Sequence, residues 1–236
     1  MTITEFKDKA SSSNWRDDDG GKIKLKFLPG VDEASIQSIE AKLGAKLPVD
    51  LRETIKICSG IEGLLIDVDF TADTYEYGAV ASLNRGFGFA HDGFGNYWYV
   101  DVLSEQEETS QIFFACHDPA FLDYVYQDIS SFFDGALKLT LDPESEFGSA
   151  RLRAVPDAEP LPYDLALSGD AELSTFANQL GPQYVFVDLR KPGSRTIIND
   201  DNIERRTELE RHTEQRIFAY IPREKKKGFL SRLFGG

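Results

Sequence analysis

The stretch FAHDGFGNYWYVDV, residues 89–102, combines a histidine, two aspartates and two glycines between aromatic residues. Side chains of these types can hold a metal ion or surround a phosphate group. His91 and Asp92 are adjacent, so on a strand they point to opposite faces, and the glycine spacing fits neither G-x-G-x-x-G nor the P-loop. Asp-Gly and Gly-Asn are instead typical of a chain reversal with positive φ. The spacing therefore predicts a hairpin turn, with Asp101 at the end of the returning strand.

A second set of chemically active side chains lies in DVDFTADTYEY, residues 67–77. Clusters of carboxylate oxygens can bind calcium, but the EF-hand order with its central glycine and final glutamate is absent. A solvated acidic loop and a surface that binds a basic protein are the other two interpretations, and all three stay open. The carboxylates concerned are Asp67, Asp69, Asp73 and Glu76.

Nucleophilic catalysis and zinc binding find less support in the sequence. The three histidines and two cysteines have no zinc-ligand spacing. Cys116 and His117 are neighbours that face apart on a strand, so they do not form a nucleophile–base pair. We therefore expect a protein that is not an enzyme, with no catalytic residue, no metal and no cofactor.

The charge of the chain restricts the class of partner. A net charge of −14 and a pI near 4.7 leave the body without the basic patch that nucleic acid requires, and favour encounter with basic partners. The 236 residues, 41% of them hydrophobic, suffice for one large domain with an appendage. Neither a secretory signal nor an apolar run of about 18 residues is visible, so we expect a cytoplasmic protein.

The elements that position these side chains begin with two helices. Asp32 can cap a first helix that ends at Gly44, and Pro48 suits the first turn of a second helix that closes before Gly60. Residues 31–60 are therefore predicted to form a helical hairpin with one apolar face.

The middle of the chain predicts a twisted, mostly antiparallel sheet. Strands are expected at 63–70, 86–90, 96–102 and 111–116. Alternation over 96–102 gives one buried face, with Trp98, Val100 and Val102, and one outward face, with Tyr97, Tyr99 and Asp101. Outward tyrosines suit protein interfaces, whereas the other aromatic residues of this region, Phe94 included, are interpreted as core.

A closing helix is expected from about 119 to 137, with Pro119 in its first turn and His117 in a capping or turn role. The polar, proline-dotted residues 141–162 predict a linker. Beyond it, residues 163–221 predict a smaller α+β extension. Its helix starts after Asp170 and ends at Gly181, and its strands lie in QYVFVDLR and QRIFAYIP.

The last segment, residues 222–236, has five basic residues against one glutamate. A disordered tail and an amphipathic segment that binds a membrane or a partner are both compatible with it. The residues of such a segment would be Lys225, Lys226, Lys227, Phe229, Leu230, Arg232, Leu233 and Phe234.

The order of these motifs resembles the SUKH superfamily over residues 29–137. IEAKLGAKLPVDLRETIKICSG is similar to its signature, in which a helix ending in Leu-Gly is followed by Leu-Pro, an acidic residue and a second helix. FAHDGFGNYWYVDV is similar to the family's central hairpin, and QIFFACHDP to its closing segment. Ser59 stands where the family more often has asparagine, and residues 160–236 have no counterpart in the minimal domain.

The resemblance implies an α+β fold and non-catalytic protein binding. Bacterial members are often immunity proteins that block a toxin, commonly a nuclease or deaminase, and the fungal branch regulates cell-wall synthesis through protein interactions. We therefore expect an immunity-type protein that covers a basic toxin cleft or, alternatively, an intracellular regulator or scaffold held near a membrane by its tail. The expected contacts are Asp67, Asp69, Asp73, Glu76, Asp92, Tyr97, Tyr99 and Asp101.

The expected organisation has five parts. They are a leader at 1–28, the SUKH-like domain at 29–140, the linker at 141–162, the small extension at 163–221 and the basic tail at 222–236.

Overall fold

The computed structural model describes residues 1–16, 20–71, 83, 85–117, 120–142, 160–191, 195–197 and 210–222. Its helices are α1 Ile3–Ser12, α2 Glu33–Leu43, α3 Val49–Ile57, α4 Ile129–Leu141, α6 Tyr163–Leu167 and α7 Ala171–Leu180. Its strands are β1 Lys26–Pro29, β2 Cys58–Glu62, β3 Asp67–Asp69, β4 Gly86–His91, β5 Tyr97–Asp101, β6 Ile112–His117, β7 Ala120–Tyr126, β8 Val185–Asp188, β9 Arg195–Ile197, β10 Glu210–Arg211 and β11 Ile217–Tyr220.

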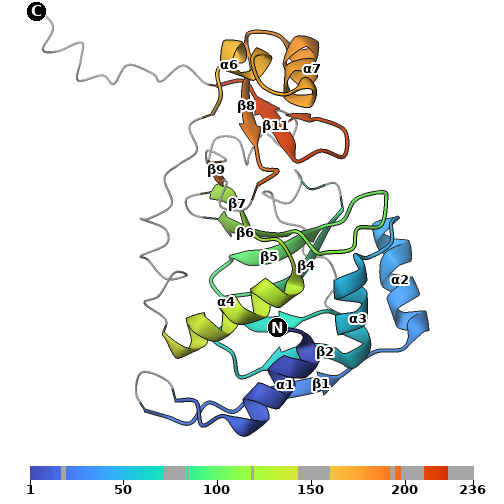
Figure 1. Ribbon diagram of the computed structural model, residues 1–236, viewed down its shortest axis with the longest axis vertical. Helices are drawn as coiled ribbons and strands as arrows, with labels where there is room; N and C mark the ends of the chain where they lie inside the picture. Colours follow the sequence, from blue (N-terminus) through green and yellow to red (C-terminus); the bar gives the residue numbers. More distant parts are fainter. Residues whose placement is uncertain are drawn as a thin grey trace, which may run out of the picture.

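The described strands form two antiparallel sheets. The main sheet has eight strands in the order β1-β2-β3-β4-β5-β6-β7-β9, and the small sheet has three in the order β10-β11-β8. Figure 1 shows α6 and α7 at the end of the molecule far from α1, with β8 and β11 between these helices and the main sheet. The predicted α+β fold with a mostly antiparallel sheet is confirmed.

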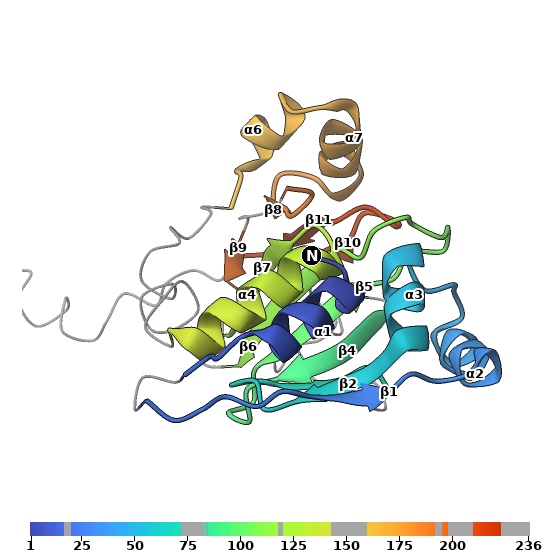
Figure 2. The same cartoon turned by 60° about the horizontal axis from the view of Figure 1, so that its bottom comes forward.

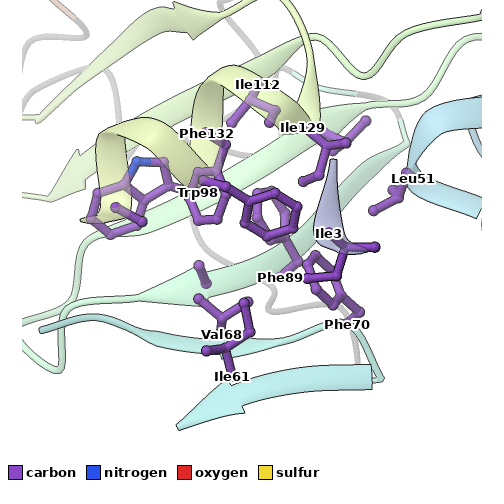
Figure 3. Close-up of a cluster of buried hydrophobic side chains, with 14 of the residues drawn as sticks. Ile3, Leu51, Ile61, Val68, Phe70, Phe89, Trp98, Ile112, Ile129 and Phe132 are labelled. Carbon is purple, nitrogen blue, oxygen red and sulfur yellow. The ribbon is translucent and has the colours of Figure 1, made fainter. Parts of the chain in front are cut away.

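One face of the main sheet, here called the inner face, packs against helices. Figure 2 shows α1 and α4 lying side by side across this face, and Figure 3 shows the side chains that meet there. Phe132 of α4 packs edge-on against Phe89 of β4, with 4.8 Å between ring centroids, and Phe6 of α1 stacks on Phe133 at 5.4 Å. The segment 1–28, expected to be a leader, therefore contributes a helix to the main core.

The helical hairpin follows the predicted caps. The Asp32 carboxylate accepts a hydrogen bond from the Ser35 N–H at 2.9 Å, and Gly44 ends α2 with φ +67°, which glycine adopts without strain. Helix α3 is shorter than expected, because the chain already enters strand β2 at Cys58 and pairs with β1 and β3.

The helix expected from about 119 to 137 is wrong in its first part. Residues Ala120–Tyr126 form strand β7, and α4 starts only after its N-cap Asp128. The apolar residues of this run fit both a helical and an alternating period, and pairing with β6 on one side and β9 on the other decides for a strand. His117 ends strand β6 instead of preceding a helix, and Pro119 lies outside the described residues.

The C-terminal unit, residues 160–222, has the predicted helix and strands. Asp170 caps α7 by accepting from the Leu173 N–H at 3.0 Å, and the helix ends before Gly181. One face of the small sheet packs against α6 and α7, and the other face lies on the main sheet. The side chains that contact the main sheet include Val187, Leu189 and Phe218. The boundaries of the five expected parts stay predictions.

Candidate protein-binding surface

The sequence-predicted contacts lie mainly on the outer face of the main sheet, opposite α1 and α4. Residues paired across neighbouring strands point to the same face. Strand pairing places four side chains in one row across β3, β4, β5 and β6, and two of them are predicted contacts. The row consists of Asp67, His91, Tyr97 and Ala115. Exposure falls along this row, from an exposed aspartate through two half-buried rings to a buried alanine.

The outer face is covered over β5, β6 and β7. Tyr99, Phe113, Leu122 and Tyr124 form one buried cluster with side chains of the C-terminal unit. Both Tyr99 and Asp101 have no exposed surface, so their expected place on an outward, partner-binding face is wrong. The alternation along the strand is real, but a distant part of the same chain buries the second face as well as the first.

Asp101 is the centre of a charged cluster between the two units, which we call the Asp101 clasp. Its two carboxylate oxygens accept hydrogen bonds from Arg211 at 2.8 and 3.1 Å and from Arg216 at 2.8 Å. Arg216 also donates to Glu107 at 2.8 Å, and both arginine side chains are more than nine-tenths buried. A buried aspartate held by two arginines is fully compensated, so it has a structural role within the chain.

A second ion pair lies beside the clasp. Arg85, which precedes β4, contacts both carboxylate oxygens of Glu214 at 3.0 Å, and the Ser104 N–H donates to the same group at 2.9 Å. Partial burial favours the neutral acid, but these hydrogen bonds outweigh it and lower the pKa of Glu214 below its ordinary value.

At the opposite end of the outer face, the β4–β5 turn is confirmed as a hairpin turn. Asp92 accepts hydrogen bonds from the Phe94 N–H at 2.9 Å and from the Asn96 backbone and side chain at 3.2 and 2.6 Å. Gly93 and Gly95 have φ of +76° and +92°, so the dipeptides predicted to allow reversal do so. The carboxylate of Asp92 therefore shapes the turn.

The β2–β3 turn lies beside the β4–β5 turn, because Asp67 at the start of β3 pairs with His91 at the end of β4. Its Leu65 N–H donates to the Thr140 hydroxyl of α4 at 3.0 Å. The Asp67 side chain is 77% exposed, and its carboxylate is 3.7 Å from the Nδ1 of His91.

Two large apolar side chains are exposed on these neighbouring turns. Phe94 is 80% exposed and Leu65 is 53% exposed. We call Leu65, Asp67, Asp92 and Phe94 the tip surface. The interpretation of Phe94 as a core aromatic is wrong, and its position between two turn glycines was the signal that could have located it in solvent.

The remaining predicted contacts lie elsewhere. Asp69 is exposed at the other end of β3, where it accepts hydrogen bonds from the backbone and hydroxyl of Thr71. Asp73, Glu76 and the tail residues from Lys225 to Phe234 lie outside the described residues. Tyr97 is half-buried behind the tip surface, with its ring 5.9 Å from that of His91.

The acidic residue of the Leu-Pro signature has a structural explanation. Asp50, two residues after Pro48, accepts hydrogen bonds from the backbone and hydroxyl of Ser110 at 3.0 and 2.6 Å and from the Ile129 N–H at 3.1 Å. One carboxylate thus joins the start of α3 to the segment before β6 and to the start of α4. A carboxylate suits this position because its two oxygens together accept all three of these hydrogen bonds.

Two further findings limit the chemistry of the described residues. Within them, no group of three or more histidine, cysteine, aspartate or glutamate side chains is arranged to hold a metal ion. In the same part of the chain, no helix has the length and apolar character to cross a membrane.

A helical hairpin, an antiparallel sheet and a closing helix together form an α+β domain of the kind that the signature motifs indicate. Residues 30–135 match the model of the SMI1 / KNR4 family (SUKH-1), so this segment is a SUKH domain and the resemblance is confirmed. The family is consistent with protein binding in immunity or regulatory roles. The C-terminal unit lies beyond the matched residues, and a comparison with curated proteins found no match.

Proposed function

We propose that this protein is a non-catalytic, immunity-type protein that neutralises a cognate toxin by binding it. The SUKH-1 match supports a protein-binding role, and the net charge of −14 favours a basic partner. The observation that carries the proposal is the exposed end of the matched domain. There Asp67 and Phe94 are 77% and 80% exposed, whereas Asp101 is already bound by arginines of the same chain.

The proposed inhibition is steric and electrostatic. A toxin that acts on nucleic acid needs a basic cleft for its polyanionic substrate, and an acidic protein that covers this cleft keeps the substrate out. Association is then fast at low ionic strength and slows as salt screens the exposed carboxylates.

The first test is affinity purification of the tagged protein from its native cells, with mass spectrometry of what binds. We expect one stoichiometric partner that has a basic nuclease or deaminase domain. A set of housekeeping or envelope-assembly proteins would contradict the proposal.

The contact surface is tested by charge reversal with that partner. Asp67→Lys together with Asp69→Lys is expected to weaken binding about tenfold or more and to reduce its salt dependence. Glu53→Lys together with Glu105→Lys is the matched control, because it changes the net charge equally at exposed positions away from β3. Equal losses in both variants would mean that only the overall charge matters.

The acidic segment, residues 67–77, is tested by changing Asp69, Asp73 and Glu76 to lysine together. Unchanged affinity for the partner would exclude this segment as a contact.

The alternative is an intracellular regulator or scaffold of the same superfamily. It is favoured by the C-terminal unit, which lies beyond the matched residues and is joined to the SUKH domain through the Asp101 clasp. In this alternative the basic tail holds the protein near a membrane. Deletion of residues 222–236 is then expected to release the protein from the membrane fraction, and unchanged fractionation would contradict it.

A further inference from the structure

We infer that Phe94 and Leu65 are the apolar anchors of the partner interface, and that the partner is a protein with an apolar pocket surrounded by lysines or arginines. The inference rests on the proposed function only in taking the partner to be a basic protein. It goes further by assigning the centre of the contact to two residues outside the acidic segment.

The two anchors share one end of the molecule. The turns that carry them are joined by the pairing of Asp67 with His91, so they lie on neighbouring strands of the same sheet. Isolated exposed apolar side chains are common and need no functional explanation. Here, however, two large ones lie on adjacent turns together with the carboxylates of Asp67 and Asp92.

Both turns hold their apolar residue in place through its own backbone. The Phe94 N–H is bound by Asp92 at 2.9 Å, and the Leu65 N–H is bound by Thr140 at 3.0 Å. The two glycines that flank Phe94 have positive φ, which leaves the intervening side chain directed away from the hairpin core and 80% exposed. An anchor whose backbone is already ordered loses little conformational entropy when it binds, so its burial contributes more to affinity.

The shape and charge of the tip surface select the partner. Sites for small molecules are concave, whereas these side chains protrude from turns, so the complementary surface is a pocket on a macromolecule. An anionic membrane would be repelled by Asp67 and Asp92. A protein pocket with an apolar centre and a basic rim complements both the apolar side chains and the carboxylates, in the arrangement typical of interface hot spots.

The test uses site-specific photocrosslinking of the full-length protein in its native cells. Phe94→p-benzoylphenylalanine is expected to crosslink on illumination to one protein, through a segment that contains lysines or arginines next to apolar residues. Leu165→p-benzoylphenylalanine is the matched control, since Leu165 is 56% exposed on α6 in the other unit, and we expect no crosslink to that protein from this position. A crosslink from Phe94 to lipid, to a second copy of this chain or to nothing would overturn the inference.

Truncation then measures the contribution of each anchor to binding of the crosslinked protein. Phe94→Ala is expected to weaken affinity about 30-fold, Leu65→Ala about fivefold and Leu165→Ala by less than twofold. Urea unfolding of each variant shows whether the fold is intact. A Phe94→Ala variant that is folded and binds within twofold of the parent would overturn the inference.

The results separate this inference from the proposed function. If Phe94 crosslinks to a basic protein that is not a toxin, the assignment of the anchors is supported and the proposed toxin neutralisation is excluded. If a toxin is captured but Phe94 neither crosslinks to it nor affects its affinity, toxin neutralisation is supported and the assignment of the anchors is excluded.

Discussion

The Asp101 clasp and the tip surface lie at opposite ends of the same outer sheet face, and both contain aspartates from residues 67–77 or 89–102. Asp101 has no exposed surface and is held by Arg211 and Arg216, whereas the side chain of Asp67 is 77% exposed. The difference shows that residue type alone does not define a binding surface. A charge that the chain itself has neutralised stabilises the fold, and only the charge left in solvent remains for a partner.

The largest effect is expected at the clasp. Asp101→Asn removes the buried negative charge and leaves Arg211 and Arg216 partly uncompensated, so unfolding free energy is expected to fall by about 3 kcal/mol or more. Equilibrium urea unfolding followed by circular dichroism measures it. Asp67→Asn is the matched control, because the same change at an exposed position should alter stability by about 0.5 kcal/mol or less. Similar losses in both variants would contradict the comparison.

A smaller loss of unfolding free energy is expected when acid protonates two carboxylates of the C-terminal unit, Asp188 and Glu214. Burial favours neutral Asp188, but hydrogen bonds from Arg190 outweigh it and lower the pKa of that carboxyl, as Arg85 does for Glu214. Because each folded pKa lies below the unfolded value, the ionised groups stabilise the fold above about pH 4, and this contribution is lost as pH falls through the lowered folded pKa values.

This pH dependence is measured from urea midpoints at pH 7, 5, 4 and 3. The double variant Asp188→Asn with Glu214→Gln is expected to be less stable at pH 7 and to lose less stability on acidification than the parent protein, because it lacks both titrating groups. An identical acid dependence in the two proteins would exclude these carboxylates as its source.

The smallest effect on stability is expected at the tip surface. Phe94→Ala should change the unfolding free energy by no more than about 0.5 kcal/mol, because an exposed side chain contributes little to folding. Thermal unfolding of the purified variant measures this change. A loss of about 2 kcal/mol would instead mean that Phe94 supports the hairpin, and the contrast with the buried Asp101 clasp would then disappear.

Much of the local structure could be predicted from particular residues. Asp32, Gly44 and Asp170 mark helix ends as expected, and the Asp-Gly and Gly-Asn pairs form the β4–β5 turn. These predictions succeeded because capping and turn formation depend on side chains within a few residues of the backbone they bind.

The candidate site was predicted less well. On the tip surface Asp67 is exposed and Asp92 is half-buried, but Tyr99 and Asp101 are buried, and Phe94 and Leu65 were not among the expected contacts. The alternation in 96–102 locates two faces without indicating whether a second layer covers the outer one. That layer comes from the C-terminal unit, whose Arg211 and Arg216 bind Asp101 from 110 and 115 positions later in the chain.

The sequence by itself determined the family motifs, the acidic character, the caps and the turn, because each depends on composition or on contacts between near neighbours. Only the tertiary structure decided that Ala120–Tyr126 is a strand, because its periodicity was ambiguous until β6 and β9 paired with it. Only the tertiary structure, too, decided which aspartates remain in solvent. Burial is a property of the layers that pack together, and here a layer from the C-terminal unit covers Asp101 while the end of the sheet that carries Asp67 and Phe94 stays exposed.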